Sequence, residues 1–114
     1  MLKANSNNRQ LMYSETTETN PLGAKIGFAL DDITGRWKSR EGAPDIRVYK
    51  SSERKNDSFF MEFAFKTGEI FRCLVKKHQG IRYVNLYGVM GLSYNTDSDV
   101  LQLSAYGKYY RVGD

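Results

Sequence analysis

The feature that most constrains this chain is a two-residue alternation of apolar and polar side chains, which begins near residue 33. It is clearest over residues 58–65, where Phe59, Met61 and Phe63 fall on one face and Glu62 on the other. Successive side chains of a strand point to opposite faces, so the pattern predicts a strand with one buried face. No helical period of comparable strength occurs in the chain.

The same alternation recurs in short segments that are separated by turn residues. The predicted strands are 33–38, 45–51, 58–65, 70–77, 81–87, 89–94, 100–105 and 106–112. Hairpin turns make neighbours in sequence neighbours in space, so about eight such strands favour an antiparallel meander. We therefore expect an all-β fold, a small antiparallel up-and-down barrel. At Gly88 the alternative to two strands is one long bent strand, since a glycine inside a strand also marks a bend.

The first 24 residues differ in composition from the rest. They are rich in Asn, Ser, Thr, Glu and Gln, and their one apolar cluster is Leu11-Met12-Tyr13. Such a segment buries too little surface to offset the entropy of ordering. We expect a flexible leader over 1–24, with a short docked arm as the alternative, and a barrel domain over 25–114. Within that domain, residues 26–30 form either a short first strand or an apolar latch.

Charge and cysteine content indicate the surroundings of the chain. The net charge of +4 permits an anionic partner without requiring one, and a single cysteine forms no intramolecular disulfide. No apolar signal region starts the chain, and no stretch reaches the roughly 20 apolar residues that a membrane helix needs. A cytoplasmic protein without a membrane partner is the expectation.

The chain offers few groups for catalysis or metal binding. His78 falls in a predicted hairpin turn, and Cys73 falls on the apolar face of its strand. Residues 95–99 imitate the first half of a calcium loop, but Val100 stands where that loop requires glycine. We expect no enzymatic activity, no cofactor and no metal site, and an ordinary hairpin turn at 95–99.

Two motifs carry a resemblance to a known family. Gly35-Arg36-Trp37, at the start of the meander, resembles the Gly-x-Trp opening of lipocalin-like (calycin) barrels. The far end is similar to the closing strands of small bacterial lipocalin-like domains, through Tyr94-Asn95, Asp99-Val100-Leu101-Gln102-Leu103 and Gly107-Lys108-Tyr109-Tyr110-Arg111. The chain also looks like a family of uncharacterised small proteins from gut bacteria and their conjugative elements. The lipocalin resemblance implies that Gly35 and Trp37 close one end of the barrel, with Arg111 lying across the indole. The disulfide pair of secreted lipocalins is missing, which puts their transport function in doubt.

Non-enzymatic binding is the predicted function, with two kinds of partner left open. One is a small apolar ligand inside the barrel, and the other is a protein on a tyrosine-rich face, with a homodimer as a variant of the latter. The residues predicted to line a pocket, or else to fill the core, are Phe59, Met61, Phe63, Phe71, Val75 and Tyr83. The tyrosines considered for the face are Tyr83, Tyr87, Tyr106, Tyr109 and Tyr110.

The alternative is a small barrel associated with nucleic acid. Single-strand binding barrels combine basic grooves with aromatic platforms. The basic patch predicted for this role spans 66–82 and has only Glu69 to oppose it. Its residues are Lys66, Arg72, Lys76, Lys77 and Arg82.

Overall fold

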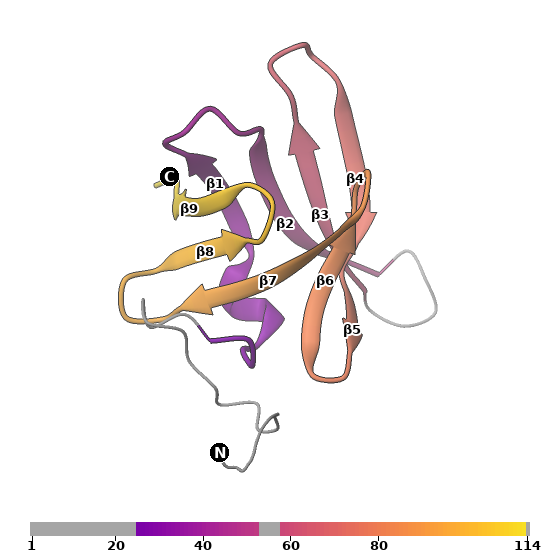
Figure 1. Ribbon diagram of the computed structural model, residues 1–114, viewed down its shortest axis with the longest axis vertical. Helices are drawn as coiled ribbons and strands as arrows, with labels where there is room; N and C mark the ends of the chain where they lie inside the picture. Colours follow the sequence, from indigo (N-terminus) through magenta and orange to yellow (C-terminus); the bar gives the residue numbers. More distant parts are fainter. Residues whose placement is uncertain (1–24, 53–57, 114) are drawn as a thin grey trace.

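The computed structural model describes residues 25–52 and 58–113, and these residues form an all-β protein (Figure 1). A 3-10 turn, Leu30–Ile33, precedes the strands. The strands are β1 (Gly35–Ser39), β2 (Asp45–Ser51), β3 (Ser58–Ala64), β4 (Ile70–Leu74), β5 (Lys76–His78), β6 (Ile81–Asn85), β7 (Val89–Asn95), β8 (Val100–Leu103) and β9 (Gly107–Arg111). All their pairings are antiparallel, so the predicted fold class is confirmed. The predicted leader, 1–24, lies outside the described residues.

The strands build one nearly closed barrel, in the order β4-β3-β2-β1-β9-β8-β7-β6-β5. The first and last strands meet, with Trp37 of β1 opposite Arg111 of β9. The two ends of the order, β4 and β5, are consecutive in sequence and are separated only by Val75. A single bent segment therefore joins the ends, because β4 pairs with β3 and β5 pairs with β6.

The bend at Val75 corrects the predicted strand 70–77, which is two strands. The Val75 backbone N–H donates to the Phe59 carbonyl at 2.9 Å and so extends the β3–β4 ladder. From Lys76 onward the chain pairs with β6 instead. This change of partner gives nine strands among the described residues where the sequence indicated about eight, and it draws the sheet into a barrel.

Gly88 separates two strands, as the sequence predicted. It has a φ of +139° and follows Tyr87, whose φ is +56°, so the chain turns here. The predicted strand 81–87 is shorter in the structure, since β6 ends at Asn85.

The entry to the barrel is a latch and not a strand. Lys25 exchanges two backbone hydrogen bonds with Tyr94, at 3.0 and 2.9 Å. Phe28 and Leu30 pack against the core. The predicted start of the first strand at Ile33 is wrong, because Ile33 ends the 3-10 turn.

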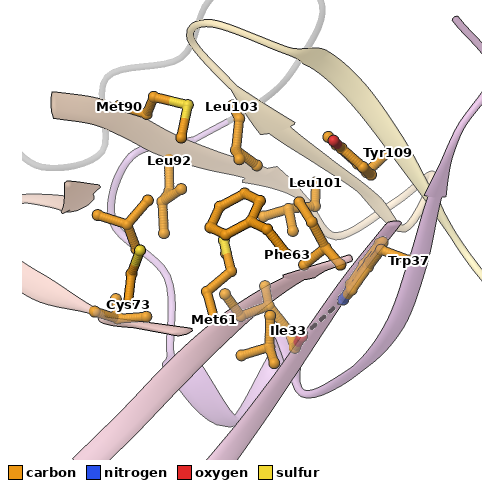
Figure 2. Packing of buried hydrophobic residues seen from close by; sticks show 14 of the residues in the cluster. Ile33, Trp37, Met61, Phe63, Cys73, Met90, Leu92, Leu101, Leu103 and Tyr109 are labelled. Atoms are coloured by element: carbon orange, nitrogen blue, oxygen red, sulfur yellow. Dashed lines mark hydrogen bonds between the residues drawn. The ribbon is translucent and has the colours of Figure 1, made fainter. Parts of the chain in front are cut away.

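Side chains from opposite walls fill the barrel interior (Figure 2). The fully buried large side chains are Trp37, Tyr109, Phe63, Ile33, Met61, Leu92, Leu101, Leu103, Val48 and Val84. Each side chain of this size contributes about 1.5–3 kcal/mol when it leaves water. None of the helical segments in the described part of the chain has the length and apolar character needed to cross a membrane.

Candidate functional site

The residues predicted to line a pocket or core divide into two groups. Met61 and Phe63 are fully buried and lie among the core side chains in Figure 2. Val75 is buried as well, while Phe59 and Phe71 are half-buried and pack against the core. Tyr83 is different, because it alternates with buried Val84 and lies on the outer face of β6. The structure thus brings five of the six together around the interior and places Tyr83 outside.

A closure cluster, made of Gly35, Trp37, Tyr94, Asp99 and Arg111, occupies the junction of β1 and β9. The Arg111 guanidinium lies 4.3 Å from the Trp37 ring centroid, which is the contact that the resemblance to lipocalin-like barrels implied. It also donates to both carboxylate oxygens of Asp99, at 2.7 and 3.0 Å. A Cβ at Gly35 would lie 2.8 Å from an Arg111 guanidinium nitrogen, so any other residue there would force the Arg111 side chain to shift.

The electrostatics of this cluster explain its pKa shifts. The hydrogen bond from Arg111 lowers the pKa of Asp99 below its usual value, and the same bond raises the pKa of Arg111. Burial raises the pKa of Tyr94, whose hydroxyl donates to Asp99 at 2.6 Å. The ionised Asp99 carboxylate accepts hydrogen bonds from Tyr94 and Arg111, and it thereby links the β7–β8 turn to β9.

Asp99 is a member of the cluster that sequence reasoning missed. It stood in the segment compared with a calcium loop, and that segment is a turn in which Asn95 Oδ1 accepts from the Asp97 and Ser98 backbone N–H groups, at 2.9 and 3.2 Å. Within the described residues no group of His, Cys, Asp and Glu side chains could hold a metal ion. The positive φ of Asp99, +56°, is visible only in the structure.

The two residues considered for catalysis, Cys73 and His78, differ in their exposure to solvent. Cys73 is buried on the inner side of β4, and its thiol donates to the Asn85 carbonyl at 3.4 Å. Burial raises the pKa of this thiol, which disfavours the reactive thiolate. His78 is exposed at the end of β5.

The basic patch predicted over 66–82 is not one surface. Lys66 lies in the β3–β4 turn, and its ammonium is near Gly42 of the β1–β2 loop. Arg72 lies on the outer face of β4, 4.4 Å from the Phe60 ring centroid. Arg82 is oriented differently, since its Nε donates to the Phe28 carbonyl at 3.2 Å.

The remaining members of that patch, Lys76 and Lys77, are exposed on β5. Lys76 lies opposite Tyr83 in the β5–β6 register, and Lys77 lies opposite Arg82. These pairs connect the basic residues to β6, whose outer side chains include Tyr83.

The predicted tyrosine-rich face is also divided by the structure. Tyr109 is fully buried, and its hydroxyl donates to the Pro44 carbonyl at 2.8 Å. Tyr110, on β9, lies beneath the Arg40 guanidinium, 3.6 Å from the ring centroid. Tyr106 packs against the core. Of the five tyrosines, only Tyr83 and Tyr87 belong to β6 and the turn after it.

That region contains an apolar depression, the β5–β7 hollow. Its volume is about 450 Å³, and it is lined by His78, Ile81, Tyr83, Val89 and Gly91. Gly91 lacks a side chain and lies opposite Tyr83, which leaves space between the strands. Two of the lining residues, Ile81 and Val89, are 43% and 66% exposed, and Tyr87, in the turn before Val89, is 79% exposed. Exposed apolar groups gathered around a depression are typical of an interaction surface.

The hollow also lies in the most basic part of the chain. Residues 70–96, which cover β4, β5, β6 and β7, contain four Lys and Arg residues and no Asp or Glu. The rest of the chain has 17 − 4 = 13 basic and 13 acidic residues, so its charges cancel. The whole net charge of +4 therefore belongs to this one segment.

Sequence reasoning missed the hollow because residues 81–87 are apolar on both faces, a pattern typical of a strand that is covered on both sides. In a barrel only the inner face of a strand is buried. Ile81 and Tyr83 therefore face outward while Val84 is buried. The signal for the hollow in the sequence was that this strand is apolar on both faces, although a barrel buries only one of them.

Comparison with protein families gives a match over most of the described chain. The family described as "Domain of unknown function, B. Theta Gene description (DUF3876)" matches residues 24–111, which is most of the chain. No significant match occurs among curated proteins or solved structures. The match confirms the resemblance to an uncharacterised family of small proteins and does not extend to lipocalin-like barrels.

Proposed function

The chain belongs to the DUF3876 family, whose description assigns no activity, and from that premise we propose that it is a non-enzymatic binding module for a protein partner. The partner presents an acidic segment with interspersed apolar residues. That segment docks on the outer face of β5, β6 and β7.

The observation that carries this proposal is the β5–β7 hollow within a segment that lacks acidic residues. Ile81 and Val89 supply apolar contact area, and Lys76 lies beside Tyr83. An acidic, apolar segment complements both properties, because burial of apolar surface supplies affinity and charge complementarity supplies selectivity. Like charge disfavours a second copy of the chain on the same face.

The barrel interior gives less support to a small apolar ligand. We propose a lipocalin-like architecture on the strength of Gly35, Trp37 and the stacked Arg111, but with the interior serving as core. Met61 and Phe63 are fully buried among the side chains that occupy the centre. A ligand there would have to displace core side chains, which costs several kcal/mol each.

Nucleic acid is the second candidate, favoured by the same acid-free segment 70–96. Tyr83 and Tyr87 could stack on bases. The exposed aliphatic side chains argue for protein instead, since Ile81 and Val89 offer bases no ring to stack on.

A selection from a random peptide library on the immobilised full chain tests the proposal. We expect enriched peptides to combine Asp or Glu with apolar residues, and to move the NMR resonances of residues 76–91. Ile81→Ser and Val89→Ser should each weaken such a peptide about tenfold, the loss expected for one partly buried aliphatic side chain.

Val100→Ser on β8 is the matched control, because Val100 also alternates with buried residues on an outer face. It should leave peptide affinity unchanged. The proposal is wrong if the selection enriches basic peptides or none, or if the shifts map elsewhere. Tight, salt-sensitive binding of single-stranded oligonucleotide on the same residues would assign the face to nucleic acid.

A further inference from the structure

A second depression, the β1–β3 hollow, lies on the outer face of β1, β2 and β3. It has a volume of about 210 Å³. Its lining residues are Arg36, Trp37, Lys38, Asp45, Ile46, Arg47, Glu62, Ala64 and Val112. Ala64 of β3 is small and lies opposite Asp45 of β2, so the outer surface of the sheet is recessed at Ala64.

Two arginines face each other across the rim of this hollow. Arg36 of β1 lies directly opposite Arg47 of β2 in the strand register, and both are exposed on the outer face. Like charges directly opposite on neighbouring strands destabilise a sheet. Lys38, two residues along β1, adds a third positive charge to the same face.

A nearby carboxylate neutralises one of the two arginines and not the other. Glu62 binds Arg47, with Nε to Oε1 at 3.3 Å, and Arg47 is further positioned 4.3 Å from the Tyr49 ring centroid. Across residues 25–52 and 58–113, neither Arg36 nor Lys38 forms an ion pair with a carboxylate. Glu62 and Tyr49 thus fix one guanidinium beside the hollow and leave Arg36 available on the other side.

We propose that the β1–β3 hollow binds a carboxylate group of a ligand between Arg36 and Arg47. The planar guanidinium presents paired donors that match the two oxygens of a carboxylate. The lining carries three positive and two negative side chains, and 3 − 2 = +1 suits a singly charged anion better than a doubly charged one. An anion in this position separates the two like charges that the strand register places opposite each other.

Titration of the full chain with acetate, followed through the side-chain Nε–H signals of arginine by NMR, tests the site. We expect the Arg36 and Arg47 signals to move in a saturable way. Arg36→Gln should abolish the change at Arg47. Lys50→Gln, which removes an exposed cation on the same strand as Arg47, is the matched control and should retain it.

The melting temperature gives an independent readout of the repulsion between Arg36 and Arg47. Without anion, Arg36→Gln should raise the melting temperature by about 1–5 °C, because it removes a repulsive cross-strand pair. A fall in melting temperature, or acetate shifts that persist in Arg36→Gln, would overturn the site. Saturation of the same signals by inorganic phosphate at lower concentration than acetate would reject the carboxylate and assign the hollow to phosphate groups.

Discussion

Arg111 joins three parts of the chain that are distant in sequence. Its guanidinium donates to the Thr34 and Asp32 carbonyls, at 2.5 and 2.7 Å, and to Asp99. It does so while stacked on Trp37. Hydrogen bonds to a charged group are stronger than neutral ones, so this side chain ties the barrel entry to the last strand.

The tie to Asp99 predicts a specific pH dependence. Because its folded pKa is lowered, Asp99 stabilises the fold above its unfolded pKa of about 3.9, and this contribution is lost as the pH falls through the folded pKa. Asp99→Asn should cost about 1 kcal/mol at pH 7, a value reduced for solvent screening of a side chain that is 40% exposed. Thermal unfolding as a function of pH should show the difference from wild type shrinking below about pH 4.

Asp97→Asn, in the same turn, is the control for this measurement and should follow the wild-type curve. A difference between wild type and Asp99→Asn that stays constant down to pH 2 would show that the ionised carboxylate is not the stabilising group.

Gly35 permits a second test at the same scale. Gly35→Ala places a Cβ against the Arg111 guanidinium at a φ of +128°, and should cost about 2–4 kcal/mol of unfolding free energy. Gly88→Ala separates the two causes, since Gly88 has a φ of +139° and nothing within 4 Å of its Cβ position. It should cost only about 1–2 kcal/mol in the same denaturant titration. Equal losses would mean that the contact with Arg111 contributes nothing.

Among the described strands, β5 is the one most exposed to solvent. It has three residues, all exposed, and it ends the strand order of the sheet. Short strands with few buried contacts open locally at low free energy. Backbone amides of β5 should therefore exchange with deuterium at least tenfold faster than those of β2 and β3, as measured by NMR. Uniform protection around the barrel would contradict this expectation.

The sequence predicted those elements in which local pattern decides the structure. Alternation over 58–65 predicted β3 and its inner face, and Gly88 predicted the division between β6 and β7. The bend at Val75 has no Gly or Pro to mark it, because it arises from a change of strand partner. The pairing of Asp99 with Arg111 and the outward position of Ile81 likewise depend on barrel closure, which local pattern does not encode.

On the scale of the whole molecule, the closure cluster at Trp37 and the face that we propose for binding are different regions of the barrel. Trp37 is fully buried, its indole N–H donates to the Ile33 carbonyl at 2.9 Å, and its ring meets Tyr94 edge-on at 6.2 Å. Trp37→Phe should cost about 2–3 kcal/mol of unfolding free energy through lost volume and this hydrogen bond.

Binding of peptides to the β5–β7 hollow should be unchanged in Trp37→Phe at temperatures where the variant is folded. Calorimetric unfolding and peptide titration of the same sample measure both quantities. A selective loss of peptide affinity with unchanged melting would make Trp37 a binding residue and not a closing one.

Residues 70–96 carry four positive charges and no negative ones, so this part of the barrel attracts negatively charged bodies. In the field of a negatively charged body, the barrel experiences a torque before any atoms touch. First encounters then occur preferentially with β5, β6 and β7 foremost, and productive collisions become more frequent than random orientation allows. Dissolved salt shortens the reach of that torque to about 10 Å at 0.1 M, so the arrival of a partner is faster in dilute buffer.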